Sequence, residues 1–221
     1  MWESMPEIDP QLVSHIFTYH SAFLGQYCYN AEWIKEFFEK VGDVDVQFCE
    51  ERRTPLFWAC MGQGRISLLH SLIAHGANVN ARDSDSETPL HMAVLNRAEE
   101  VVYSLFDAGA SVNAKDNALR TPLHFCADPA IMRALLRAGA DPNAKNFIGD
   151  TPLMNAVVIG NEEALPILLA YGARVSDKND KGLTALDLAS RNRRFSETTR
   201  KILRDAYQAE QAKNSNRKEA P

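Results

Sequence analysis

Histidines and cysteines are the side chains most able to bind a metal or act in catalysis here, and their spacing predicts neither role. His91 and His124 occupy the same place in two Thr-Pro-Leu-His phrases. They are therefore equivalent positions of a repeated motif rather than neighbours in one site. No Cys-x-x-Cys pair or other metal-ligand spacing occurs among the four cysteines, which are Cys28, Cys49, Cys60 and Cys126. We therefore expect reduced, mostly buried thiols and no metal site.

Motifs for nucleotide binding and hydrolysis are also missing from the sequence. It contains no glycine-rich phosphate loop, no Gly-x-Ser-x-Gly and no His-Glu-x-x-His. Gly62-Gln63-Gly64 indicates a turn between helices rather than a nucleotide fingerprint. We expect no enzyme, no catalytic residue and no cofactor.

The composition favours a folded chain and argues against nucleic-acid binding. Hydrophobic residues make up 45% of the 221 residues, enough to bury a continuous core. The net charge of −5 and pI of about 5.7 argue against a general nucleic-acid binder, which needs a basic face. Residues 1–53 carry a net charge of −6 and residues 187–221 a net charge of +4, a difference that can orient a partner.

No targeting or membrane segment is evident. The acidic N-terminus lacks the basic and apolar regions of a secretory signal, and no apolar run approaches the roughly 20 residues of a membrane span. We expect a monomer in the cytoplasm or nucleus, without membrane insertion.

A period of about 33 residues organises the chain. Thr-Pro-Leu or Thr-Ala-Leu recurs at spacings of 34, 33, 30 and 33 residues, at Thr54, Thr88, Thr121, Thr151 and Thr184. A Gly-Ala pair ends an apolar helical pattern in step with it, at Gly76, Gly109, Gly139 and Gly172. Threonine suits a helix N-cap, proline the first helical position, and glycine the left-handed residue after a helix end. Each period therefore predicts a helix pair that must stack on its neighbours to bury its apolar face.

The phrases TPLHMAV, TPLHFCA, TPLMNAV, LLRAGADPNAK and LIAHGANVNARD resemble the ankyrin repeat. The resemblance covers residues 54–207 and implies an all-α solenoid of helix-turn-helix units with short β-hairpin tips. It also implies that His91 and His124 form hydrogen bonds between neighbouring units. We expect that network to be interrupted where other residues replace the histidine, at Phe57, Met154 and Asp187.

This resemblance divides the chain into seven segments. A degenerate helical capping repeat covers 1–53, four repeats cover 54–87, 88–120, 121–150 and 151–183, a C-terminal capping repeat covers 184–211, and a disordered tail covers 212–221. Alternatively, residues 5–17 faintly resemble the opening of an F-box, a segment that recruits ubiquitin ligases.

Two departures from the family pattern carry structural expectations. The repeat that starts at Thr121 is three residues short, with Asp128-Pro129 at the turn between its helices. The glycine two places before the repeat threonine is kept at Gly149 and Gly182 but replaced elsewhere, so we expect differently shaped hairpin tips at Arg52, Ser86 and Leu119.

The family resemblance implies that a partner docks on the hairpin tips and first helices. The candidate binding residues at those positions are Leu95, Ala118, Arg120, Phe147, Ile148, Val158, Ile159 and Leu183. Phe147 and Ile148 stand on a tip where polar residues are usual, and grouped apolar side chains on a surface are typical of binding hot spots. Three asparagines resemble sites of asparaginyl hydroxylation, although their alternative role is to bond the hairpin: Asn80, Asn113 and Asn143.

We predict a non-catalytic scaffold or adaptor that binds a protein partner. Two alternatives stay open: a ubiquitin-ligase substrate receptor that recruits through residues 5–48, and a microbial or viral effector that acts on host proteins.

Overall fold

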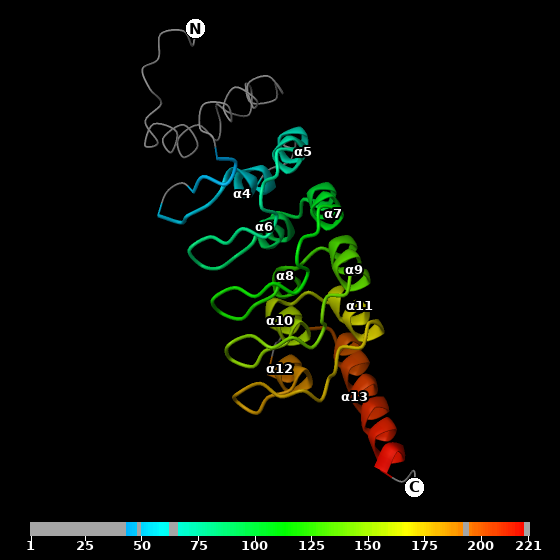
Figure 1. Cartoon of the computed structure of the whole chain (residues 1–221). Coiled ribbons are helices and arrows are strands. Elements are labelled where there is room, and N and C mark those ends of the chain that lie inside the picture. The colour runs from blue at the N-terminus through cyan, green and yellow to red at the C-terminus, as the bar shows by residue number, and fades with distance from the viewer. Residues whose placement is uncertain (1–42, 48–49, 62–65, 192–194, 219–221) are drawn as a thin grey trace, which may run out of the picture. The chain divides into compact units, whose positions relative to one another are not determined.

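The computed structural model describes residues 43–47, 50–61, 66–191 and 195–218, and the chain forms two compact units, residues 1–110 and 111–221. Ten helices form in the described residues (Figure 1). The expected N-terminal cap and its F-box alternative fall mainly on residues 1–42, outside the described part.

Unit 1 contains two helix pairs. The first pair is α4 (Pro55–Cys60) and α5 (Ile66–Ala74), and the second is α6 (Pro89–Leu95) and α7 (Glu99–Asp107). First helix packs on first helix and second on second, so that α4 contacts α6 and α5 contacts α7 (Figure 1). The side chains between them are fully buried, among them Leu56, Phe57, Leu69, Leu72, Leu90 and Leu105.

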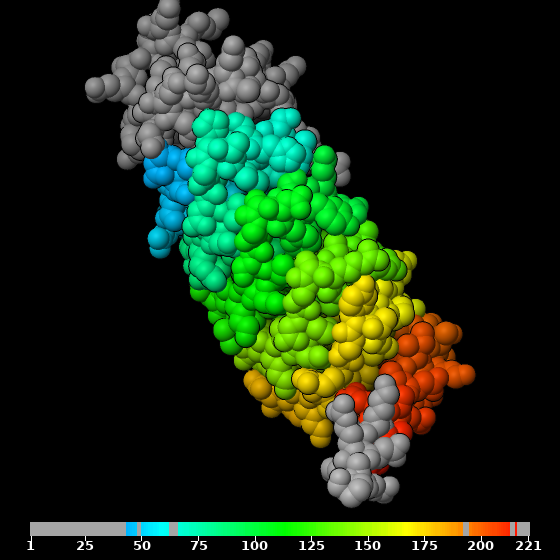
Figure 2. Space-filling model, turned by 45° about the vertical axis from the view of Figure 1, so that its right-hand side comes forward, coloured from blue at the N-terminus to red at the C-terminus, as the bar shows by residue number. Residues whose placement is uncertain are grey.

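Unit 2 repeats this arrangement with three pairs. They are α8 (Pro122–Phe125) with α9 (Pro129–Arg137), α10 (Pro152–Ile159) with α11 (Ala164–Ala170), and α12 (Ala185–Arg191) with α13 (Glu197–Lys218). Helix α10 contacts both α8 and α12, and α11 contacts both α9 and α13. In the space-filling view, α13 (orange to red) lies against the yellow α11 segment (Figure 2). Within each unit, the predicted stack of helix pairs is confirmed.

The repeat threonine and histidine start the first helices as a pair. Thr121 is the extended N-cap of α8, and its amide donates to Nδ1 of His124 at 3.0 Å. Because Nδ1 accepts, the ring proton sits on Nε2, which donates to the carbonyl of Asp150 in the next hairpin at 3.2 Å. The predicted structural role of His124 between repeats is thus confirmed. His91 forms the same pair with Thr88 in unit 1.

At Asp187 the bonds within the repeat are kept, and the expected interruption of the network between repeats stays a prediction. One carboxylate oxygen of Asp187 accepts from the amide of Thr184 at 2.9 Å and from its hydroxyl at 2.7 Å. These hydrogen bonds, the backbone one first, lower the pKa of Asp187 below its ordinary value. A carboxylate oxygen therefore replaces the imidazole Nδ1 as acceptor.

A buried aspartate or asparagine closes four of the hairpin tips, five residues before Thr88, Thr121, Thr151 and Thr184. Oδ1 of Asp116 accepts from the amides of residues 118 and 120, at 2.9 and 2.7 Å. The same pair of bonds forms at Asp83, Asn146 and Asn179. We call these four residues the clip residues. A backbone bond also crosses each of these four tips, from the amide of the clip residue to the carbonyl four residues later. The predicted hairpin tips are therefore present, but these four contain no β-strand.

The tips that lack glycine have the same backbone as those that keep it, so the expected difference in shape is wrong. Arg52, Ser86 and Leu119 have φ of 55°, 60° and 58°, close to 76° at Gly149 and 71° at Gly182. A left-handed conformation costs a residue with a Cβ about 1–2 kcal/mol. At residues 86 and 119, the hydrogen bonds of the clip residue impose it nevertheless.

Two further features concern the helix ends in unit 2. The side chain of Asp128 caps α9 by accepting from the amides of residues 130 and 131, which confirms that the three-residue deletion falls in the turn between α8 and α9. Helix α13 continues to Lys218, so the predicted disordered tail is wrong for residues 212–218. Alanine, lysine and arginine favour helix in this segment, and no glycine or proline interrupts it before Lys218. Residues 219–221 lie outside the described part.

We expect Leu119→Gly to stabilise the protein by about 0.5–1 kcal/mol, because it relieves left-handed strain at an exposed side chain.

Gly149→Ala should instead cost about 2 kcal/mol, since the new Cβ would lie 2.7 Å from Oδ1 of Asp180 and 2.9 Å from its amide nitrogen. Gly182→Ala is the matched control, with similar φ and open space, and should cost about half as much. Chemical denaturation measures all three; equal losses for the two alanine variants would contradict the tip geometry.

We also expect stability to fall as the pH drops through about 6.5. Burial, the largest effect, lowers the pKa of His124 below its ordinary value of 6.5, so in this range the unfolded chain binds a proton that the folded ring does not. The urea concentration at the midpoint of unfolding should fall between neutral and mildly acidic pH, and it should fall less in His124→Asn than in the wild type. Asparagine keeps a hydrogen-bond acceptor and a donor at this position but does not titrate. An equal decline in both proteins would show that His124 has no part in it.

Candidate functional site

Three consecutive hairpin tips of unit 2 are joined edge to edge by backbone hydrogen bonds. The amide of Phe147 donates to the carbonyl of Ala118 at 2.9 Å, and the amide of Asp180 donates to the carbonyl of Ile148 at 3.1 Å. The tips therefore form one continuous row along this unit (Figure 1). Phe147 and Ile148 occupy its centre.

The side chains of Phe147 and Ile148 lie exposed at the tip between the clip residue and the left-handed glycine. Their exposed fractions are 64% and 38%, whereas the clip residue Asn146 is buried beneath them. Phe147 leaves most of its surface in solvent, and Ile148 is only partly covered, so the fold depends on these side chains less than on the buried leucines. We call Phe147 and Ile148 the tip patch.

A second apolar patch lies at the C-terminal end of α10. Val158 and Ile159 have exposed fractions of 58% and 59%. Helix α8 ends at Phe125 because its repeat is three residues short. The residues equivalent to Val158 and Ile159 in that repeat are Asp128 and Pro129, which already begin α9. The last turn of α10 thus has no counterpart in α8, and its apolar side chains stay uncovered on that side. We call Val158 and Ile159 the helix patch.

Three other predicted binding residues mainly support the hairpins. Nε of Arg120 lies 2.6 Å from a carboxylate oxygen of Asp116, and its guanidinium lies 4.4 Å from the centre of the Phe125 ring. Ala118 and Leu183 are half-buried at their tips, and Ala118 also accepts the hydrogen bond from Phe147. Leu95, by contrast, has an exposed fraction of 53% at the end of α6, but it belongs to unit 1.

The asparagines that resemble hydroxylation sites connect consecutive repeats. Asn143 donates from Nδ2 to the carbonyl of Gly172 at 3.0 Å and accepts at Oδ1 from the amide of Arg174 at 2.8 Å. Asn113 makes the equivalent pair with residues 139 and 141, and Asn80 donates to the carbonyl of residue 109. Hydroxylation stays a prediction, on side chains that the stack already uses.

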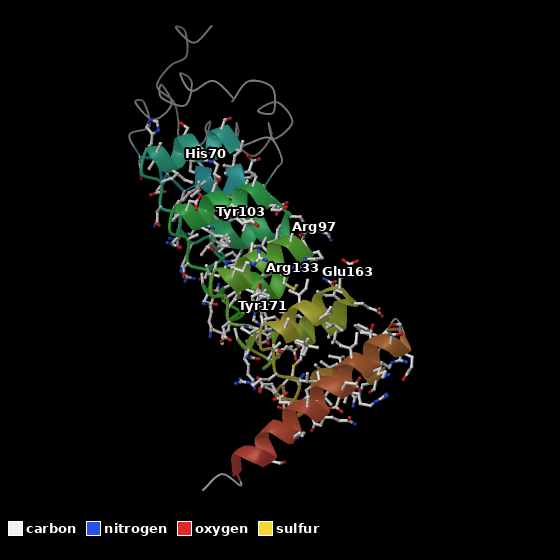
Figure 3. All side chains as sticks on the ribbon, turned by 90° about the vertical axis from the view of Figure 1, so that its right-hand side faces the viewer. His70, Arg97, Tyr103, Arg133, Glu163 and Tyr171 are labelled. Carbon is white, nitrogen blue, oxygen red and sulfur yellow. The ribbon has the colours of Figure 1, made fainter. Side chains whose placement is uncertain are left out.

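Large exposed apolar side chains stand apart from one another on the second-helix side of the described part of unit 2, as Tyr171 and Ile202 do. Figure 3 shows Arg133 on α9, Glu163 before α11 and Tyr171 after it, all on this face. Tyr171 carries a hydroxyl group and has an exposed fraction of 38%. The grouped apolar exposure in unit 2 therefore belongs to the tips and to the end of α10.

Chemistry-bearing groups are not assembled in the part of the chain that the structure describes. Its histidines, cysteines and acids form no group of three able to hold a metal, and none of its helices is long and apolar enough to cross a membrane. Cys60 and Cys126 are buried free thiols, and burial raises the pKa of Cys60. Cys28 and Cys49 lie outside the described residues.

The chain is similar to ankyrin-repeat segments of larger proteins. It is 31% identical over 165 residues to the intracellular phospholipase A2 of Caenorhabditis elegans, covering 72% of this chain and 13% of that protein. It is 35% identical over 152 residues to Ankyrin repeat and SOCS box protein 16 of Homo sapiens, covering 63% and 33%. With the glycerophosphocholine phosphodiesterase of Schizosaccharomyces pombe the identity is 33% over 137 residues, covering 61% and 9%. The chain thus spans a third or less of the length of these relatives.

The family model for ankyrin repeats in three copies matches residues 22–116, 64–146 and 123–214, which together include nearly the whole chain. Its range agrees with the periodic phrases, the helix pairs and the hairpin tips described above. The chain belongs to the ankyrin-repeat family.

Proposed function

We propose that this chain is a non-catalytic interaction module that holds a segment of a partner protein on the hairpin tips and first helices of unit 2. The tip patch is the observation that carries the proposal: a phenylalanine and an isoleucine stand exposed on a turn fixed by hydrogen bonds. A fixed apolar surface loses little conformational entropy when a partner binds, so burial of these side chains contributes to affinity.

The neighbouring repeats support this role of the tip patch. Phe147 is bonded through its amide to the preceding tip, and Ile148 through its carbonyl to the following one. The backbone beneath both side chains is therefore held from two sides. The helix patch adds apolar area on the first helix of the same repeat, and Leu95 is a separate candidate contact in unit 1.

The double variant Phe147→Ser/Ile148→Ser tests this function. We expect at least a tenfold loss of partner recovery in quantitative affinity purification, because tenfold in affinity corresponds to about 1.4 kcal/mol and buried aromatic anchors are commonly worth more. Thermal stability should change little, since neither side chain is buried in the fold.

Ile202→Ser is the matched control, because Ile202 has the same exposed fraction as Ile148, 38%, but lies on α13. It should leave partner recovery unchanged. Partner sets and amounts that are the same for wild type and the double variant would refute the proposal.

The ubiquitin-ligase alternative needs a separate test, since residues 5–48 fall mainly outside the described part. Loss of ligase subunits from the purified complexes when those residues are deleted would favour it. Retention of the partner by the same deletion variant would assign partner binding to the repeats.

A further inference from the structure

A row of lysines runs beside the tip patch. Lys115, Lys145 and Lys178 each directly precede a clip residue, so they occupy the same place in three consecutive hairpins of unit 2, and all three are exposed. Nζ of Lys145 donates to the carbonyl of Lys178 at 2.8 Å, so its side chain lies along the stem of the next hairpin. Lys181 adds a fourth exposed amine on the tip that follows Ile148.

Several carboxylates near this row already have partners within the hairpins. Asp116 is paired with Arg120, and Oδ1 of buried Asp150 accepts from Nδ2 of Asn179 at 2.7 Å. Asp187 accepts from Thr184. Asp180 is the exposed acid on these tips. These bonds do not neutralise the carboxylates, but Asp116 and Asp150 are buried, so the exposed charged side chains of the three tips are mainly lysines.

The charge of the whole unit has the same sign. Residues 111–221 contain 17 lysines and arginines against 13 aspartates and glutamates, a net charge of +4. Residues 187–221 supply all of this excess, since residues 111–186 contain eight of each kind. Residues 1–110 contain 7 against 16, a net charge of −9. The positive charge at the C-terminal end of unit 2 attracts acidic partners to the unit that carries the tip patch.

We infer that the partner segment is a peptide with apolar side chains flanked by aspartate or glutamate. This inference rests on the proposed function. The apolar side chains would cover Phe147 and Ile148, and the carboxylates would lie along the lysines. Lys145 is two residues from Phe147, so the carboxylates should fall within a few residues of the apolar anchor.

The two kinds of contact contribute differently to binding. Each exposed ion pair is worth at most about 1 kcal/mol and weakens with salt, whereas the apolar anchor supplies affinity that salt affects little. The lysines would therefore select acidic segments and speed their association. Removing lysines should lower both the affinity and its dependence on salt, and removing the tip patch should lower the affinity alone.

The test selects short random peptides from a display library on the full chain at low salt, then measures binding of the enriched peptides by fluorescence anisotropy. We expect enriched sequences with an apolar core and flanking acids. Lys115→Gln/Lys178→Gln should weaken their binding about five- to tenfold at low salt and flatten the salt dependence. Arg133→Gln/Arg137→Gln removes the same charge from α9 and should have a clearly smaller effect.

Each other outcome overturns a defined part of the account. Peptides that need Phe147 and Ile148 but carry no acidic excess, or that ignore the lysine variant, would reject the acidic partner and leave the proposed function standing. Acidic peptides that bind Phe147→Ser/Ile148→Ser as well as wild type would reject docking on the tip patch itself. A single-stranded oligonucleotide that binds as tightly as the peptides, regardless of Phe147 and Ile148, would show that the lysines attract polyanions in general.

Discussion

Each repeat leaves backbone groups that only its neighbour can satisfy, and this constraint determines the rest of the structure. The loop after a second helix exposes a carbonyl and an amide, and the asparagine of the preceding repeat bonds both, as Asn143 does with residues 172 and 174. In unit 1, the carboxylate of Asp45 takes the asparagine's place and accepts from the amide of residue 78. In unit 2, Asn143 already bonds the last loop, and Glu210 of α13 additionally accepts from the amides of residues 175 and 176. Elements at both ends of the described repeats thus bond the loops beside them, as expected where stability is shared between neighbouring repeats.

This mutual support is what makes the tip patch useful for binding. The hairpins contain no strand ladder of their own, yet clip residues and backbone bonds between adjacent tips fix Phe147 and Ile148 in place. A surface held in this way tolerates apolar side chains that contribute nothing to folding, because stability comes from the buried leucines and the hydrogen bonds below. The shortened repeat adds to the exposed area by leaving the end of α10 uncovered. Binding residues and folding residues are thus largely different sets in unit 2.

The sequence was sufficient to predict the helix pairs, because threonine, proline, leucine and glycine act locally at each helix end. It also placed the exposed apolar residues on a tip. It was not sufficient where a distant or unfamiliar partner decides the outcome. Asp187 replaces the histidine through an oxygen acceptor, and Leu119 adopts a glycine-like φ because Asp116 holds its hairpin. The clip residues could have been found from the sequence, because an aspartate or asparagine stands five residues before four of the five repeat threonines. The lysines of the row are about 30 residues apart in the sequence, so their grouping on one surface can be recognised only when the hairpins are known to lie side by side.

Native-state hydrogen exchange of the Asn143→Ala variant tests most directly whether neighbouring repeats close each other's backbone. We predict that the amide of Arg174, which donates to Asn143 at 2.8 Å, exchanges several-fold faster, since losing an exposed hydrogen bond costs about 0.5–1.5 kcal/mol. The amide of Asp141, which donates to Asn113, should keep more of its protection. Unchanged exchange at Arg174 would contradict the claim that the side chain of one repeat stabilises the next.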